Sequence, residues 1–213
     1  MVLSGGGYKG IAHVGVLKAL KEYNISPNYV SGTSAGALVG AFYAADYSIE
    51  TMKQFFKKTS IFKLSRLGTN KPGLLDSEKF YTDLHFYFPE NSFLSLKKTL
   101  FVTTTDLIKG CTQIFNSGNL IKPLIASAAF PGVFSPVEIN ESLYTDGGVL
   151  DNFPVNAIKD KCDFIIGVDI MPMAKLQKSD LKHSYDIIQR AYYLRGIPNS
   201  EGKYTDCDLI INH

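Results

Sequence analysis

The sequence Gly32-Thr33-Ser34-Ala35-Gly36 lies between an apolar, strand-like stretch and a stretch of good helix formers. A glycine two residues to either side of a serine is typical of a nucleophile elbow, which is a sharp turn between a strand and a helix. Side chains at the two glycine positions would collide as the backbone folds back on itself. Because the turn exposes the serine oxygen beside a helix start, it favours developing negative charge there. The segment therefore predicts a nucleophilic Ser34.

Strand-like and helix-like segments alternate on both sides of this turn. Short apolar or β-branched runs predict strands, and apolar residues at helical spacing predict helices. The predicted strands cover residues 1–4, 29–31, 99–105, 112–115, 137–139, 142–145, 163–168 and 208–212. The predicted helices cover residues 11–23, 35–45, 48–58, 77–88, 120–129 and 179–193. The alternation indicates an α/β layered sandwich in which helices flank a largely parallel central sheet.

The length and composition set the broad class of protein. The chain has 213 residues, of which 45% are hydrophobic and 20% are charged. We therefore expect one globular domain over residues 1–213. A net charge of +2 is too balanced to indicate a nucleic-acid partner. Because no apolar run has the length of a membrane span and the glycine loop at residue 5 leaves no room for a signal peptide, we expect a cytoplasmic location.

The cysteines do not form a zinc or redox motif. They are odd in number, widely spaced and without a C-x-x-C pair, so we expect Cys111, Cys162 and Cys207 to be reduced, buried thiols. No carboxylate cluster at calcium-ligand spacing accompanies the candidate site, so we expect no metal and no cofactor. Nothing in the sequence indicates an oligomeric state.

A second glycine-rich segment, Gly5-Gly6-Gly7-Tyr8-Lys9-Gly10, follows the first predicted strand. Its G-x-G-x-x-G spacing also occurs in dinucleotide sites, but those carry an acidic residue about twenty residues further on, where this chain has Ser-Gly-Thr-Ser. A P-loop does not fit either, because Ile11 follows the last glycine. What remains is a cradle of backbone N–H groups at a helix start, and such donors would hold an oxyanion.

A serine nucleophile needs a base, and the usual partner is histidine. None of the four histidines has a convincing setting. His13 lies in the first predicted helix, where we expect it at the surface or partly buried, and His85 lies among apolar and aromatic residues. His183 lies among polar residues, and His213 ends the chain.

An aspartate is the better candidate for the base. Asp146 ends a predicted strand and is followed by Gly147 and Gly148, which permit a tight loop that presents the carboxylate at the edge of the sheet. The competing carboxylates are Asp106, Asp151 and Asp169. Of these, Asp169 also ends a strand, but without a glycine pair it is more typical of a plain polar strand end.

Three segments in chain order, GGGYKG at 5–10, GTSAG at 32–36 and DGG at 146–148, resemble those of the patatin-like phospholipase family. The segments ASAAFPGVF at 126–134 and NFP at 152–154 extend the resemblance over nearly the whole chain. It implies a patatin-like fold and a Ser-Asp dyad without histidine, with Ser34 as nucleophile and Asp146 as its base. It also implies that Gly5, Gly6 and Gly7 supply the oxyanion hole. The supporting loop residues are Lys9, Gly10, Gly32, Gly36, Gly147 and Gly148. Many relatives carry arginine at the position of Lys9, and lysine keeps the charge without the planar fork.

The resemblance further implies hydrolysis of phospholipid, lysophospholipid or another acyl ester, with release of a fatty acid. Two alternatives remain open. One is a thioesterase or acyltransferase that uses the same dyad, and the other is a non-catalytic lipid-binding module that retains the loops as a scaffold.

Residues 53–71 contain six lysines or arginines and no acidic residue, interleaved with aromatic and aliphatic side chains. Two interpretations fit this pattern. The segment would bind an anionic membrane as a peripheral contact, each cation contributing about 1 kcal/mol near the surface. Alternatively, it is a solvated helix whose apolar face packs into the core.

Overall fold

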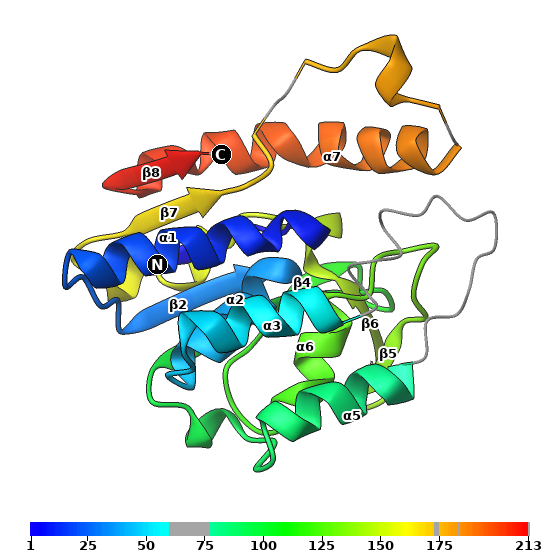
Figure 1. The fold of residues 1–213 in the computed structure, drawn as a ribbon. Coiled ribbons are helices and arrows are strands. Elements are labelled where there is room, and N and C mark those ends of the chain that lie inside the picture. Colours follow the sequence, from blue (N-terminus) through cyan, green and yellow to red (C-terminus); the bar gives the residue numbers. More distant parts are fainter. Residues whose placement is uncertain (60–76, 173–174, 183, 213) are drawn as a thin grey trace.

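The computed structural model of the chain describes residues 1–59, 77–172, 175–182 and 184–212. Within these ranges, helices flank one eight-stranded sheet (Figure 1). The strands are β1 (Val2–Leu3), β2 (Tyr29–Thr33), β3 (Thr99–Asp106), β4 (Cys111–Phe115), β5 (Val137–Ile139), β6 (Ser142–Asp146), β7 (Ile166–Asp169) and β8 (Leu209–Asn212). The α-helices are α1 (Ile11–Glu22), α2 (Ala35–Ala44), α3 (Ile49–Lys58), α5 (Ser77–Tyr87), α6 (Ile121–Ser127) and α7 (Ser184–Gly202). Short 3-10 turns at Gly7–Gly10 and Gly147–Val149 follow β1 and β6. The predicted α/β class is confirmed.

Hydrogen-bonded strands follow the path β5-β6-β3-β2-β1-β7-β8, and β4, off this path, pairs with β3. The four pairings that involve β1, β2 or β7 are parallel. The pairings of β3 with β4, of β3 with β6 and of β5 with β6 are antiparallel. The sheet is therefore parallel through its centre and antiparallel at one end, as expected for βαβ units followed by hairpins.

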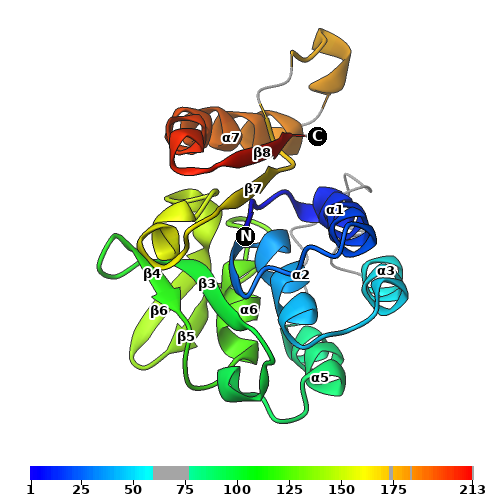
Figure 2. The same cartoon turned by 90° about the vertical axis from the view of Figure 1, so that its left-hand side faces the viewer.

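The two faces of the sheet bury different sets of side chains. Figure 2 shows α1 and α3 on one side of the strands, where Leu3, Val14 and Phe42 belong to the larger apolar core. On the other face Val2 packs in a smaller core with Phe153. Because successive strand residues point to opposite faces, Val2 and Leu3 alone show that β1 is covered on both sides.

The register of β3 explains how two distant segments meet. β4 pairs with residues 102–106 of β3, so β2 and β6 must share its other edge. β2 runs parallel to β3 and ends with Thr33 opposite Thr103, while β6 runs antiparallel and ends with Asp146 opposite Thr104. The two strands therefore point toward each other along one edge of β3. This arrangement brings residues 34 and 146 together.

Two predicted elements differ most from the structure, since each begins at least three residues later than predicted. The strand predicted at 163–168 is Ile166–Asp169, because Phe164 is exposed and precedes the buried strand. The helix predicted at 179–193 is α7, which begins at Ser184 and continues through Gly196 and Pro198 to Gly202. The late glycine and proline are typical of a helix end, but tertiary packing, which buries Ser200, outweighs that preference.

The predicted burial of the cysteines was wrong. Cys111 is exposed and Cys162 and Cys207 are partly exposed, although all three are free thiols. Cys111 begins β4, which lies outside the main strand order and pairs only with β3. An edge position of this kind leaves one side of the strand uncovered.

The first part of the basic segment follows the core interpretation. Phe55 and Phe56 are buried in the main core, whereas Lys57 and Lys58 are exposed in the last turn of α3. The two phenylalanines therefore do not face a lipid surface. Residues 60–71 lie outside the described residues. Across the ranges that the structure describes, no helix combines the length and apolarity that a bilayer span requires.

Candidate active site

The elbow predicted around Ser34 is present between β2 and α2. Ser34 has φ 53° and ψ −121°, a backbone conformation that non-glycine residues rarely adopt and that costs of order 1–3 kcal/mol. Gly36 must be glycine because a Cβ there would overlap the Leu3 carbonyl oxygen, and a Cβ on Gly32 would lie 2.6 Å from the Gly36 carbonyl oxygen. Close approach of β1, β2 and α2 thus holds the strained turn, and Ser34 remains partly exposed.

A buried serine in the α6 segment holds this turn from the other side. The Ser34 N–H donates a hydrogen bond of 2.8 Å to Ser127 Oγ, which in turn donates to the Thr103 carbonyl oxygen at 2.7 Å. Because Thr103 pairs with Thr33, this relay ties the elbow to the strand on which β2 and β6 meet. Sequence reasoning placed Ser127 within the family-like segment 126–134 but assigned it no role.

Asp146 lies at the end of β6 and is 4% exposed. Its carboxyl group accepts a 2.8 Å hydrogen bond from the Gly148 N–H, and the Ser34 hydroxyl lies near enough to lower its pKa. The backbone is fixed as well, because the Asp146 N–H donates to the Ala129 carbonyl at 3.0 Å. The structure therefore brings the predicted nucleophile and base together.

Burial sets the protonation of this carboxyl group. Removal from water raises the pKa of Asp146 to about 7, while the hydrogen bonds from Gly148 and Ser34 lower it in part. No lysine or arginine among the described residues forms an ion pair with Asp146. A carboxylate with a pKa near neutrality is a better proton acceptor than an ordinary aspartate, because a base is most effective when its pKa lies near the working pH.

The glycine loop lies beside Ser34. A Cβ on Gly5 would lie 3.3 Å from the Ser34 Cβ. The Gly5 N–H, however, already donates to the Asn152 carbonyl oxygen at 3.1 Å. For the N–H groups of Gly6 and Gly7, the described residues provide no acceptor. Gly7 has φ +56° and open space where a side chain would be. Of the three predicted oxyanion donors, only these two remain available.

His13 differs from its predicted setting because it is fully buried. Its Nε2 donates to the Ser4 carbonyl oxygen at 2.8 Å, directly before the glycine loop. Burial lowers the pKa of His13 to about 4, against smaller raising effects of the Ser4 carbonyl and Asp169. The reason is helical spacing, since His13 shares the inward face of α1 with Leu17 and Leu20. A neutral histidine here supports the loop.

The remaining histidines do not change this picture. His85 is exposed and its ring stacks on Tyr81. His183 and His213 lie outside the described residues. Among the described residues, Asp146 therefore stays the candidate base for Ser34.

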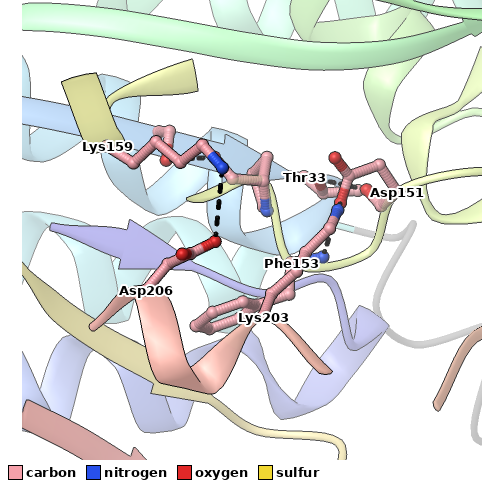
Figure 3. A network of polar contacts seen from close by, with 8 residues as sticks. Thr33, Asp151, Phe153, Lys159, Lys203 and Asp206 are labelled. Carbon is pink, nitrogen blue, oxygen red and sulfur yellow. Dashed lines mark hydrogen bonds and ion pairs between the residues drawn. The ribbon is translucent and has the colours of Figure 1, made fainter. Parts of the chain in front are cut away.

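Asp151, one of the competing carboxylates, is committed to a lysine. Its Oδ1 lies 2.7 Å from Lys203 Nζ in an ion pair that is almost fully buried, and it also accepts from the Phe153 N–H. Figure 3 shows this cluster, in which the Thr33 hydroxyl donates to the Asp151 carbonyl at 2.9 Å. Thr33, the residue before the nucleophile, is therefore hydrogen-bonded to the loop that contains Asp151. Lys203, from the C-terminal part of the chain, holds this loop through the ion pair.

The other two competing carboxylates, Asp106 and Asp169, also have hydrogen-bond partners. Asp106 caps a turn by accepting from the N–H groups of Ile108 and Lys109 and from the Ser142 hydroxyl. Asp169 accepts from the Tyr204 hydroxyl at 2.6 Å and from the Met171 N–H. Both carboxylates have structural partners.

The predicted supporting loop residues surround the site. A Cβ on Gly10 would meet Ala35, one on Gly147 would overlap the Thr103 carbonyl oxygen, and one on Gly148 would lie 3.1 Å from Asp146 Oδ1. The backbone overlap requires glycine at position 147, whereas at position 148 the close neighbours are side-chain atoms. The Lys9 side chain is partly exposed, and no described carboxylate forms an ion pair with it.

Several known proteins are similar to this chain in sequence or in fold. The family model described as "Patatin-like phospholipase" matches residues 1–158. The chain belongs to this family. Lysophospholipase NTE1 of Meyerozyma guilliermondii is 33% identical over 177 residues, which cover 80% of this chain and 12% of that protein. Neuropathy target esterase sws of Drosophila melanogaster is 31% identical over 179 residues, which cover 80% of this chain and 13% of that protein. The chain thus spans about an eighth of the length of these relatives.

Among solved structures, VipD from Legionella pneumophila matches with a TM-score of 0.58 at 16% sequence identity. The match covers 83% of this chain and 50% of that one. At this identity the likeness concerns the fold, and it agrees with the patatin-like arrangement of the sheet. The family match ends at residue 158, before β7, α7 and β8. Lys203, which clamps the Asp151 loop, therefore belongs to the part of this patatin-like chain outside the family match.

Proposed function

We propose that this patatin-like chain is a lipid acyl hydrolase in which Ser34 is the nucleophile and Asp146 its general base. One observation carries the proposal: a strained, partly exposed serine lies next to a buried carboxyl group that has no cationic partner among the described residues. Activation of a serine by an adjacent base within hydrogen-bond reach is the general signature of nucleophilic catalysis. No step requires a metal or cofactor.

In the first step the Ser34 oxygen attacks the ester carbonyl carbon, and its proton passes to the Asp146 carboxylate. The carbonyl oxygen becomes an oxyanion that needs preformed hydrogen-bond donors. The N–H groups of Gly6 and Gly7 suit this role, because no described residue accepts from them and the loop adjoins Ser34. Gly5 serves the site differently, since its N–H fixes the loop to Asn152.

In the second half of the reaction Asp146 returns its proton to the leaving oxygen and then activates water, which releases the fatty acid from Ser34. The relatives named lysophospholipase and esterase favour a lipid ester with one acyl chain as substrate. Acyl transfer or thioester hydrolysis would use the same two residues, so the choice among them depends on the acceptor and on the bond cut.

A fluorophosphonate probe tests the nucleophile, because it forms a covalent adduct with an activated serine. We expect one adduct on the wild-type chain and on Ser26→Ala, an exposed serine before the start of β2 at the opposite end of that strand from Ser34, and none on Ser34→Ala. Incubation with phospholipid, lysophospholipid and an acyl thioester, with and without an alcohol acceptor, identifies the reaction. An unlabelled wild type that still binds lipid would favour the non-catalytic module.

Three further parts of the proposal concern the whole chain. β1, near the start of the sequence, and β8, near its end, belong to the same sheet, which supports one domain over residues 1–213. Peripheral contact with an anionic membrane stays a prediction for the lysines of segment 53–71, and salt-dependent co-sedimentation with anionic vesicles tests it. A cytoplasmic location likewise stays a prediction.

A further inference from the structure

One side chain outside the family-matched region reaches the Asp146 turn. Tyr192 lies on α7, and its hydroxyl oxygen is 3.2 Å from the position that a Cβ on Gly148 would take. Asp146 Oδ1 lies 3.1 Å from the same position. The tyrosine hydroxyl and the carboxyl group therefore adjoin the same side of the Gly147–Gly148 turn.

The ring of Tyr192 is packed, but no described residue forms a hydrogen bond with its hydroxyl. The ring contacts Phe130 edge-on, with centroids 4.9 Å apart, and Tyr193 at 5.7 Å. Its hydroxyl oxygen is buried without a hydrogen bond to any residue that the structure describes. An unsatisfied buried hydroxyl destabilises the folded state, and such groups are rare in native proteins. A phenylalanine would fill the same space without that cost, so the hydroxyl calls for a functional explanation.

The surroundings keep this hydroxyl protonated. Burial raises the pKa of Tyr192, the nearby Asp146 and Tyr193 raise it further, and Arg195 opposes them only in part. A protonated phenol without a partner is a free hydrogen-bond donor. Since no described residue accepts from it, a bound substrate or water would complete this hydrogen bond.

We propose that Tyr192 is a further catalytic residue, which donates a hydrogen bond to the leaving oxygen of the ester. This inference rests on the proposed function of Ser34 and Asp146. The leaving oxygen must come next to Asp146, because it receives the proton that Asp146 took from Ser34. The free donor adjoins the same turn. The carbonyl oxygen, in contrast, is directed to the glycine loop.

The step balances without transfer of the tyrosine proton. The Ser34 oxygen forms a bond to the carbonyl carbon, the bond from that carbon to the leaving oxygen breaks, and the electron pair of the broken bond goes to the leaving oxygen. The proton moves from Ser34 to Asp146 and then to the leaving oxygen. Tyr192 keeps its proton and stabilises the negative charge on this oxygen while it develops.

The variant Tyr192→Phe tests this role, with Tyr193→Phe as the matched control. Two esters of the same fatty acid are compared: a lysophospholipid, whose alkoxide leaves poorly, and a p-nitrophenyl ester, whose phenolate leaves without assistance. A hydrogen bond to a charged group contributes about 1.5–3 kcal/mol, so kcat for the lysophospholipid should fall about 10- to 160-fold in Tyr192→Phe. The rates for the p-nitrophenyl ester and for fluorophosphonate labelling should stay at the wild-type value.

Thermal stability provides a second readout. Removal of a hydroxyl with a merely structural role would lower the Tm, whereas this proposal predicts a rise. Because Tyr192→Phe keeps the ring contact with Phe130 and removes an unsatisfied buried group, its Tm should rise by about 2–4 °C. In the control Tyr193→Phe, the ratio of the two ester rates should equal that of the wild type.

The outcomes separate this inference from the proposed function. Equal losses on both esters, full activity on both, or a lowered Tm in Tyr192→Phe would overturn the role of Tyr192 and leave the dyad intact. A wild-type chain that neither hydrolyses the esters nor reacts with the probe would overturn the proposed function, and the inference with it.

Discussion

Two turns that follow β6 within a few residues hold buried carboxylates in opposite circumstances. Asp146 begins the first turn, accepts a hydrogen bond from the Gly148 N–H and lies next to Ser34, with no described cation. Asp151 lies in the second turn and forms a buried ion pair with Lys203 (Figure 3). Burial raises the pKa of both, and the lysine opposes the shift only at Asp151. An aspartate thus acts as a proton acceptor in the first turn and as one half of a structural ion pair in the second.

The largest effect should come from exchanging each carboxyl group for an amide. Asp146→Asn keeps an oxygen for the Gly148 N–H but loses the base, so kcat/KM should fall about 10²- to 10⁴-fold, the contribution typical of general-base catalysis. Its free energy of unfolding above pH 7 should be no lower than that of the wild type, because a buried charge without a cation is removed. Ester hydrolysis and thermal unfolding measure the two effects.

The matched variant Asp151→Asn should show the reverse pattern. It leaves the Lys203 ammonium buried without a counter-charge, so stability falls more than activity. If Asp151→Asn lost activity as Asp146→Asn does while retaining its stability, the division of roles between the two turns would be wrong.

The next largest effect concerns the ion pair between Asp151 and Lys203. Lys203→Met leaves the Asp151 carboxylate unpaired in a buried position, which should cost about 3–5 kcal/mol of unfolding free energy. The double variant Asp151→Asn with Lys203→Met should recover much of this loss, because neither charge remains. Urea unfolding of the single and double variants gives the coupling between the two residues.

A second ion pair in the same cluster serves as the control. Lys159 and Asp206 lie 3.6 Å apart, but both side chains are more than one third exposed. Solvent screens such a pair, so Lys159→Met should cost less than about 1 kcal/mol. If Lys159→Met lost as much unfolding free energy as Lys203→Met, burial would not be what distinguishes the Asp151–Lys203 ion pair.

A smaller effect should appear in the pH dependence of stability. Asp146 has a pKa of about 7 in the folded chain and about 3.9 in an unfolded one, so between these values the folded state holds a proton that the unfolded state has released. Its contribution to stability is therefore present at pH 4 and is lost as pH rises to 7, by at most about 1.4 kcal/mol per pH unit. Unfolding of the wild type and Asp146→Asn at pH 5 and pH 7 tests this, and parallel curves would contradict it.

The local parts of the site could be predicted from sequence because glycines report close backbone approach. Gly32 and Gly36 mark the elbow, and Gly147 and Gly148 mark the turn that presents Asp146, and each requirement is visible in short-range geometry. The layered fold follows in the same way from the alternation of strands and helices. Ser48 was likewise predictable as the N-cap of α3, where its hydroxyl accepts from the Thr51 N–H.

The parts that depend on long-range packing could not be predicted. The meeting of β2 and β6 on one edge of β3 requires the register of three strands, which no single motif encodes. Lys203 and Tyr192 reach the site from α7 and the turn after it, so their roles follow only from the docking of the C-terminal segment. His13 became buried because its neighbours on α1 determine the inward face, whatever its own polarity.

The rate at which Ser34 reacts with a fluorophosphonate, measured from pH 5 to pH 9 in the wild type and in Asp146→Asn, tests most directly whether Asp146 activates the serine. The wild-type rate should rise with pH, about tenfold per unit below 7, and level off above it, because only the carboxylate form accepts the proton. Asp146→Asn should react slowly and without this step. A variant that retained the wild-type rate and the rise near pH 7 would contradict the assignment of Asp146 as the base.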